Sequence, residues 1–166
     1  EKNGANAPFS GFKGSDLGEG GIRTPFFMQW PDKIERKTTY HNPVSSFDIF
    51  ATLKSIINPD LELPNQIHGK NILPYLSGEK EGMPHENLFW KINGDFKIIN
   101  NDTIKGKDRF AIRHKNYKMI VDKDGNNFLY DLDSDISEKN NIAFDFPEMT
   151  NELRKKINEW NKKTID

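Results

Sequence analysis

The sequence has 166 residues, which fits a single domain or one domain with a small appendage. Its formal net charge of −1 gives no electrostatic case for binding nucleic acid or an acidic membrane surface, and no apolar run approaches the length of a transmembrane helix. Cysteine is absent, which excludes disulfides, thiolate metal sites and cysteine nucleophiles, while 12 phenylalanines and 3 tryptophans argue against a disordered chain.

The first informative stretch is a glycine-rich loop that begins at Gly11 and carries a single lysine, Lys13. It leads into an apolar run, residues 25–30, that stops at Pro31. A short apolar run between glycine and proline predicts a buried strand over residues 22–30. A flexible loop that feeds a strand is a common way to place one cation beside a bound anion. A lysine in such a loop is also typical of solvated surface, so the residues alone leave both interpretations open.

A helix is predicted to start near Ser45 and to end before Pro59. Ser45 with Asp48 three residues later fits a capping box, in which Asp48 is a cap rather than a ligand. The apolar residues of this helix recur at spacings of three and four, so they share one face and are predicted to be core. They are Phe47, Phe50, Leu53 and Ile57.

The second half of the chain changes to a period of two, which predicts an antiparallel meander of four or five strands. Asn93 and Gly94 are expected to form a hairpin turn between the first two strands, and residues 100–109 are expected to be a polar loop. The strands are expected at residues 88–92, 96–99, 110–114, 117–122 and 128–132.

The end of the chain predicts a helix over residues 147–163, because Pro147 suits a first helical turn and Glu148 suits the positive end of the helix dipole. Its apolar stripe should pack on the meander, and its basic residues are interpreted as solvated surface. The stripe consists of Met149, Leu153, Ile157 and Trp160.

The string that starts at Lys13 and continues through residues 19–25, Glu-Gly-Gly-Ile-Arg-Thr-Pro, resembles the lysine-to-"EGGxRxP" segment of the type I sulfatases, in the alkaline-phosphatase-like superfamily. Residues 68–78 are similar to the family's "DG-x-(S/N)-(L/I)-x-P-x-L-x-G" run, with His68 where Asp is usual. Residues 111–120 and 129–148 resemble the "AvR…wKli" and "LYDL…E…NLA…PE" parts of its C-terminal subdomain. The resemblance covers nearly the whole chain, but only the C-terminal third or so of a full sulfatase.

The resemblance implies a fold of the α/β to α+β class. Residues 1–80 would be the incomplete C-terminal end of an alkaline-phosphatase-like α/β domain, and residues 79–84 a linker. Residues 85–166 would be the sulfatase C-terminal subdomain, a four- or five-stranded antiparallel sheet packed by a C-terminal helix. The strand at 22–30 would belong inside a larger, mostly parallel sheet that this chain does not supply.

The resemblance also implies site residues. Lys13 would contact the sulfate oxygens, as both a substrate-binding and a catalytic residue, and Glu19 and Arg23 would be structural. Asn3 stands where the family's "DNG" ligates calcium, but Lys2 replaces the Asp, and an ammonium beside a dication is repulsive. Asn3 fits a plain turn residue equally well. Calcium is therefore expected in the complete family enzyme, and no metal is expected to bind to this chain alone.

The family's nucleophile is a formylglycine made in a C/S-x-P-x-R motif, and no cysteine or serine of this chain begins such a motif. The chain is therefore expected to be part of an enzyme that hydrolyses sulfate esters of glycans, inactive without an N-terminal sulfatase portion from the same gene or an adjacent chain. Its expected partners are that portion and a sulfated carbohydrate, with no nucleic acid and no membrane. The location implied by the family is periplasmic or secreted, although residues 1–4 carry no apolar signal core.

Two other functions remain open. The missing nucleophile and Lys2 would also suit a non-catalytic module, derived from a sulfatase, that binds a partner or a glycan. A phosphoryl-transfer relative from the same superfamily is a third possibility, which the C-terminal meander fits less well than it fits a sulfatase.

Overall fold

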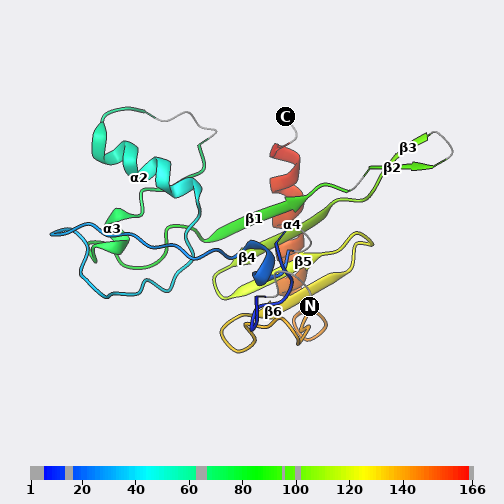
Figure 1. Ribbon diagram of the computed structural model, residues 1–166. Coiled ribbons are helices and arrows are strands. Elements are labelled where there is room, and N and C mark those ends of the chain that lie inside the picture. Colours follow the sequence, from blue (N-terminus) through cyan, green and yellow to red (C-terminus); the bar gives the residue numbers. More distant parts are fainter. Residues whose placement is uncertain (1–5, 14–16, 63–66, 95, 100–101, 165–166) are drawn as a thin grey trace. The chain divides into compact units, whose positions relative to one another are not determined.

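A computed structural model describes residues 6–13, 17–62, 67–94, 96–99 and 102–164 of the chain (Figure 1). Backbone contacts divide the chain into two compact units. Unit 1 consists of Glu1–Thr24 together with Asn87–Asp166, and unit 2 is Pro25–Glu86. The expected division into residues 1–80 and 85–166, with a linker at 79–84, stays a prediction. The contact units add that the first 24 residues cluster with the second half of the chain.

Unit 1 contains a four-stranded antiparallel sheet in the order β1-β4-β5-β6 (Figure 1). Its register sets Trp90 opposite Ala111, and Ala111 opposite Ile120. The tight turns follow the sequence, with Lys115 (φ 53°) between β4 and β5 and Gly125 (φ 88°) between β5 and β6. The meander expected in this half is therefore confirmed. The strands are β1 (Asn87–Ile92), β4 (Arg109–His114), β5 (Tyr117–Val121) and β6 (Asn127–Asp131).

The predicted pairing between the first two strands of the meander is wrong. β2 (Phe96–Ile99) pairs with β3 (Asp102–Lys105), which falls inside the expected polar loop, and β1 pairs directly with β4. Gly94 lies at the base of this two-stranded arm rather than in a hairpin turn. A Cβ atom there would lie 1.9 Å from the carbonyl oxygen of Gly106, so the two returning chains can pass only because residue 94 is a glycine.

The C-terminal helix α4 (Pro147–Thr164) covers one face of the four-stranded sheet, as its apolar stripe predicts (Figure 1). Leu153 and Ile157 are buried against sheet residues that all point to that face, among them Met119. The ring of Trp160 stacks on Phe89 at a centroid distance of 5.1 Å. Burying each such aliphatic side chain stabilises the fold by about 1.5–3 kcal/mol. The sheet residues of this core are Ile112, Met119, Val121 and Leu129.

Unit 2 is built around α2 (Phe47–Ile57) and the short α3 (Leu73–Leu76). The predicted capping box of α2 forms only in part. Asp48 Oδ2 accepts a hydrogen bond from the Ser45 amide at 2.7 Å, as expected. The Ser45 hydroxyl accepts from the Phe47 amide at 3.4 Å instead of the Asp48 amide, and the helix begins after Ser46, whose side chain makes no cap hydrogen bond. The predicted apolar core face is wrong. Phe47, Phe50, Leu53 and Ile57 are all exposed, Ile57 by 80%. The buried residues of α2 are Asp48, Ala51 and Thr52 instead.

The buried face of α2 is set by polar contacts to the segment after residue 67. Asp48 accepts a hydrogen bond from the amide of Lys70 at 2.8 Å, and the hydroxyl of Thr52 accepts one from the amide of Ile72 at 3.0 Å. A Cβ atom at Gly69 would lie 2.1 Å from the Phe47 carbonyl oxygen, so this segment approaches the helix backbone very closely. The segment therefore covers the side of α2 that a simple count of apolar residues assigns to the surface.

The predicted buried strand over residues 22–30 does not form in this chain. Residue 22 ends the short helix α1 (Glu19–Ile22), and residues 23–30 are extended without strand pairing. Phe27 is 92% exposed, and no backbone hydrogen bond is donated by residues 25–29 within the described part of the chain. A strand needs a partner edge, and every described strand of the chain lies between residues 87 and 131, outside unit 2.

Candidate functional site

The two residues assigned to the site by resemblance have different positions. Lys13 is exposed, and its ammonium makes no ion pair or hydrogen bond with the described residues. Asn3 and its neighbour Lys2 lie outside the described residues, so their roles stay predictions. The structure therefore places one candidate cation on the surface of unit 1 and leaves the metal-ligand assignment untested.

The backbone on the N-terminal side of Lys13 is fixed against α1. The amide of Gly20 donates to the carbonyl oxygen of Ser10 at 2.7 Å, and the side-chain amide of Asn6 donates to the Gly20 carbonyl at 2.7 Å. A Cβ atom at Gly20 would lie 2.5 Å from the Gly11 carbonyl oxygen. Glycine is needed at position 20 because the backbone of Gly11 packs directly against it and leaves no room for a side chain.

A buried ion cluster lies beneath this loop. Lys118 on β5 is fully buried, and its Nζ atom lies 2.8 Å from Glu138 Oε1 and 3.0 Å from Glu19 Oε1. The contact to Glu138 Oε1 is an ion pair without hydrogen-bond geometry. Removing three charges from water is costly, so the cluster persists only because each charge has a close partner of opposite sign. We call Lys118, Glu19 and Glu138 the buried cluster.

Strand alternation explains why a lysine can sit in this central strand. Successive side chains of β5 point to opposite faces, so Met119 faces α4 while Lys118 faces the N-terminal segment. Lys118 stands directly opposite Arg113 on β4, and two like charges in that position repel. Glu19 relieves this repulsion, because its Oε2 atom lies 3.5 Å from Arg113 Nη1 while its Oε1 atom binds Lys118.

The expectation that Glu19 and Arg23 are structural fits these contacts. Glu19 is buried and shared by Lys118, Arg113 and the half-exposed Arg23, whose Nη1 atom lies 3.7 Å away. The guanidinium of Arg23 also lies 4.8 Å above the ring of Phe9, so it covers the N-terminal loop. Both residues hold the loop and α1 against the sheet.

No sequence pattern connects Lys118, Glu138 and Ser10. Glu138 Oε2 accepts hydrogen bonds from the hydroxyl of Ser10 and, at 2.7 Å, from the amide of Glu19. The partners are 119 and 128 residues apart in the chain. The one local signal was a lysine flanked by apolar residues in a period-two strand, since burial on both faces leaves no solvated position for its charge.

A second buried carboxylate lies in unit 2. Asp48 is fully buried, and its two oxygens lie 2.7 and 2.9 Å from His85 Nε2. Burial alone would raise the pKa of Asp48, but hydrogen bonds from His85 and from the amides of Lys70 and Ser45 outweigh it and hold the pKa below its usual value. This contact joins α2 to His85 near the C-terminal end of unit 2, and its role is structural.

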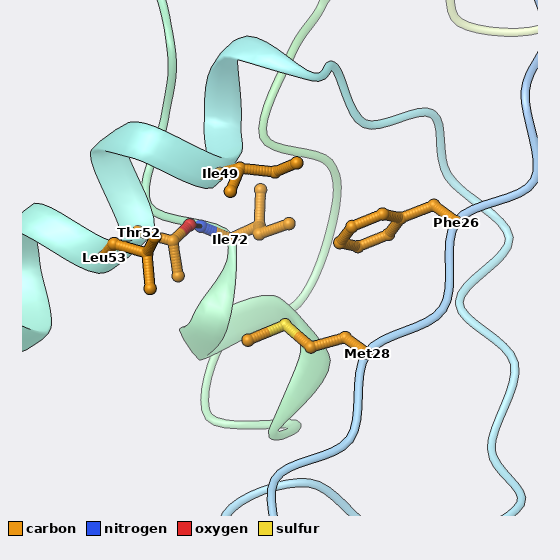
Figure 2. Close-up of a pocket in the computed structure, with 6 residues that line it drawn as sticks. All are labelled: Phe26, Met28, Ile49, Thr52, Leu53 and Ile72. Carbon is orange, nitrogen blue, oxygen red and sulfur yellow. Dashed lines mark hydrogen bonds between the residues drawn. The ribbon is translucent and has the colours of Figure 1, made fainter.

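A small apolar hollow of about 40 Å³ also lies in unit 2 (Figure 2). Figure 2 shows Phe26 and Met28 pointing from the extended segment toward Ile49 on α2 and toward Ile72. No charged group lines it, so it does not suit a sulfate or another anion. Its lining consists of Phe26, Met28, Ile49, Thr52, Leu53 and Ile72.

The described residues do not fit a calcium site by themselves. Calcium takes about six to eight oxygen ligands, and no group of three or more His, Asp or Glu side chains that could hold a metal occurs in the described ranges. Asn3 would add at most one side-chain oxygen. In the part of the chain that the structure describes, no helix is long and apolar enough to cross a membrane.

Comparison with known proteins places the chain among sulfatases. The family model described as N-sulphoglucosamine sulphohydrolase, C-terminal, matches residues 15–163. The sulfatase YdeN of Escherichia coli (strain K12) is 25% identical over 93% of this chain and 32% of its own length. An N-acetylgalactosamine-6-O-sulfatase of Bacteroides thetaiotaomicron is 33% identical over 81% of this chain and 26% of its own length. The chain thus spans a third or less of these relatives.

Solved structures show the same fold. Ps i-CgsB in complex with k-i-k-neocarrahexaose superposes with a TM-score of 0.77 at 23% identity, over 94% of this chain and 32% of that chain. A 2-O GAG sulfatase superposes with a TM-score of 0.56 at 20% identity, over 72% of this chain and 25% of that chain. At these identities the likeness concerns the fold, which agrees with the expected sheet packed by a C-terminal helix.

Proposed function

We propose a function on the basis of the family to which the chain belongs, the sulfatase family of N-sulphoglucosamine sulphohydrolase C-terminal domains within the alkaline-phosphatase-like superfamily. The chain would be the part of a sulfatase that presents Lys13 to the sulfate group of the substrate. The observation that carries this proposal is the state of Lys13. Lys13 is exposed and its ammonium makes no ion pair or hydrogen bond with the described residues, while the loop before it is fixed by the hydrogen bond between Ser10 and Gly20. A positioned cation of this kind can meet an anion that arrives from outside the chain.

Lys13 would act by electrostatics. Hydrolysis of a sulfate ester breaks an S–O bond and leaves negative charge on the departing and the sulfate oxygens. An ammonium held beside these oxygens stabilises that charge, and removing one such donor typically costs about 100- to 1000-fold in kcat. Lysine serves as a compact point charge in this role. No proton transfer by Lys13 is required for it to act in this way.

The nucleophile would come from outside this chain. No serine or cysteine here begins the C/S-x-P-x-R motif, and the chain spans a third or less of the relatives described above. We therefore expect no turnover by these residues alone and full activity only with an N-terminal sulfatase portion. Calcium would belong to that complete site, with Asn3 as a single candidate ligand from this chain.

Unit 2 offers a surface that suits such a portion. One face of α2 exposes apolar side chains, and the segment around Phe27 is extended, with no backbone hydrogen bond donated by residues 25–29 to any described residue. Apolar exposure of this extent is uncommon on a free monomer and marks a surface that another part of a protein covers. An added sheet would satisfy the backbone of residues 25–29 and bury Phe27 at the same time.

The substrate would be a sulfated carbohydrate. This follows from the names of the relatives, an N-acetylgalactosamine-6-O-sulfatase and a 2-O GAG sulfatase, and is proposed for the complete protein.

A non-catalytic module that binds a partner or a glycan is the second candidate. The absence of the nucleophile motif and Lys2 at the usual Asp position favour it. The two candidate functions differ in whether an added N-terminal sulfatase portion produces hydrolysis of a sulfate ester.

A complementation assay separates them. The purified chain is incubated with a chromogenic aryl sulfate, alone and after co-expression with an N-terminal sulfatase portion that carries the C/S-x-P-x-R motif and the formylglycine modification. We expect no turnover alone and turnover with the portion added. Turnover by the isolated chain refutes the division of labour, and a stable complex without turnover supports the non-catalytic module.

A further inference from the structure

Glu138 connects the loop that carries Lys13 to the sheet. One of its carboxylate oxygens, Oε2, accepts from the Ser10 hydroxyl, three residues before Lys13, and from the Glu19 amide, six residues after it. Its other oxygen faces the buried ammonium of Lys118 at 2.8 Å. Ser10 and Glu19, which lie on either side of Lys13 in the sequence, are therefore both bound by a single carboxylate, and that carboxylate contacts the fully buried Lys118.

The local backbone indicates that this arrangement is specifically built. Glu138 has a φ of 53°, a left-handed conformation that is uncommon for a residue with a side chain. Its amide is fixed by the carbonyl of Asp135 at 3.1 Å. On the other side, a Cβ atom at Gly18 would lie 2.4 Å from Ser10 Oγ, so Ser10 is packed against the backbone with little freedom. A hydrogen bond to a carboxylate in such a setting contributes more than one between neutral groups.

We infer that Glu138, backed by Lys118, is the positioning residue for Lys13. It touches neither the substrate nor the reacting atoms, and it acts by fixing the position of Ser10, three residues before Lys13. This inference rests on the proposed role of Lys13 in sulfate binding. Small displacements of a positioned group reduce rates strongly, by up to about 100-fold for a shift near 1 Å.

The absence of cysteine allows a direct test of loop order. A Lys13→Cys substitution takes a nitroxide spin label at that single position, and Lys123→Cys places the same label in an exposed turn of the same unit as a control. Each labelled protein is then combined with Glu138→Ala and, separately, with the milder Ser10→Ala, which removes only the hydroxyl. Circular dichroism checks that each variant is folded.

The expected result is a narrower central line, reporting faster motion, for the label at position 13 in the Glu138→Ala variant, with a smaller change in Ser10→Ala and no change at position 123. Two outcomes overturn the inference. One is an unchanged spectrum at position 13 in both folded variants. The other is an equal change at positions 13 and 123, which would mean that Glu138 supports the whole unit. Should Glu138→Ala fail to fold, Ser10→Ala alone decides between these outcomes.

A kinetic cycle in the complete protein tests the functional half. If Glu138 acts through Lys13, Glu138→Ala lowers kcat/KM by up to about 100-fold, and the double variant with Lys13→Ala loses no more than Lys13→Ala alone. If the losses in kcat/KM of the two single variants instead multiply in the double variant, the inference is overturned. An unchanged kcat/KM in Lys13→Ala would instead refute the proposed role of Lys13 and leave the spin-label result intact, so the two failures are distinguishable.

Discussion

At the scale of single residues, Lys118 shows how a charge can be stable inside a sheet. It is fully buried on the face opposite α4, where Glu19 and Glu138 lie within 3.0 Å of its ammonium. Neither carboxylate is close to it in sequence, so the contact depends on the fold as a whole. The free energy that the cluster adds over an apolar core is small, but losing one member is costly.

Replacing Lys118 with methionine should therefore destabilise the protein strongly. Lys118→Met leaves two carboxylates close together with no buried cation, and breaking a buried pair in this way costs about 3–5 kcal/mol. Urea unfolding gives the free energy of unfolding directly. The exposed Lys155→Met is the matched control and should change it by less than about 0.5 kcal/mol. Equal effects of the two substitutions would show that the cluster contributes nothing specific.

The buried carboxylate of Asp48 predicts a pH dependence. Burial opposes its charge, but the hydrogen bonds from His85, Lys70 and Ser45 win, so its pKa in the folded protein lies below the usual 3.8. A depressed pKa contributes stability that is fully present above the unfolded-state value and is lost as the pH falls through the folded-state value. The advantage of Asp48 should thus persist at neutral pH and shrink below about pH 3.8.

Urea unfolding of wild type and Asp48→Asn across this pH range checks the sign. The asparagine variant should be less stable at pH 7, because its amide nitrogen faces the donors that Asp48 accepts from, and the gap should narrow in acid. The exposed Asp60→Asn serves as the control and should leave the curve unchanged. A gap that widens as the pH falls would contradict the proposed protonation behaviour.

At the scale of elements, the extended segment around Phe27 predicts a contrast in amide exchange. The amides of residues 26–29 donate no backbone hydrogen bond to the residues that the structure describes, whereas the amides of Met119 and Val121 lie in a central strand. In the monomeric chain the amides of residues 26–29 should exchange at rates close to those of an unfolded peptide, and those of Met119–Val121 should be strongly protected. Hydrogen exchange followed by NMR measures both. Equal protection would mean that the segment already has a partner within this chain.

Sequence reasoning succeeded for elements whose signals are local. Pro147 and the stripe with Leu153 and Ile157 predict α4 over residues 147–163, and the helix spans Pro147–Thr164. The turns at Lys115 and Gly125 set the order of β4, β5 and β6. The pairing of β1 failed because Asn93-Gly94 is a good hairpin signal by itself. The choice between a hairpin and a two-stranded arm depended on β4, seventeen residues beyond β1.

Other predictions were wrong because the sequence does not show which segment packs on which face of a helix. The apolar residues of α2 predict a core, and the chain instead buries Asp48 and Thr52 against residues 70–72. The site shows the same limit. Lys13 was found from its place in a motif, but Glu138 was not, because its partner Ser10 lies 128 residues away and no local pattern marks that contact.

At the scale of the whole molecule, the two units divide the proposed work. Unit 1 folds around its own sheet and helix and carries the Lys13 loop on the buried cluster. The described part of unit 2 contains two helices, α2 and the short α3, and α2 exposes an apolar face. Such exposure is expected of a part that completes a larger domain. The chain spans a third or less of the length of these relatives, which agrees with this division of roles.

The most direct test of the account is the activity of the complete sulfatase with Lys13→Ala, beside the exposed Lys123→Ala as a charge-matched control. Hydrolysis of an aryl sulfate and of a sulfated oligosaccharide gives kcat/KM for each protein, and thermal unfolding verifies that both remain folded. The account predicts a loss of about 100-fold or more for Lys13→Ala and wild-type values for Lys123→Ala. A folded Lys13→Ala enzyme with undiminished kcat/KM would contradict it.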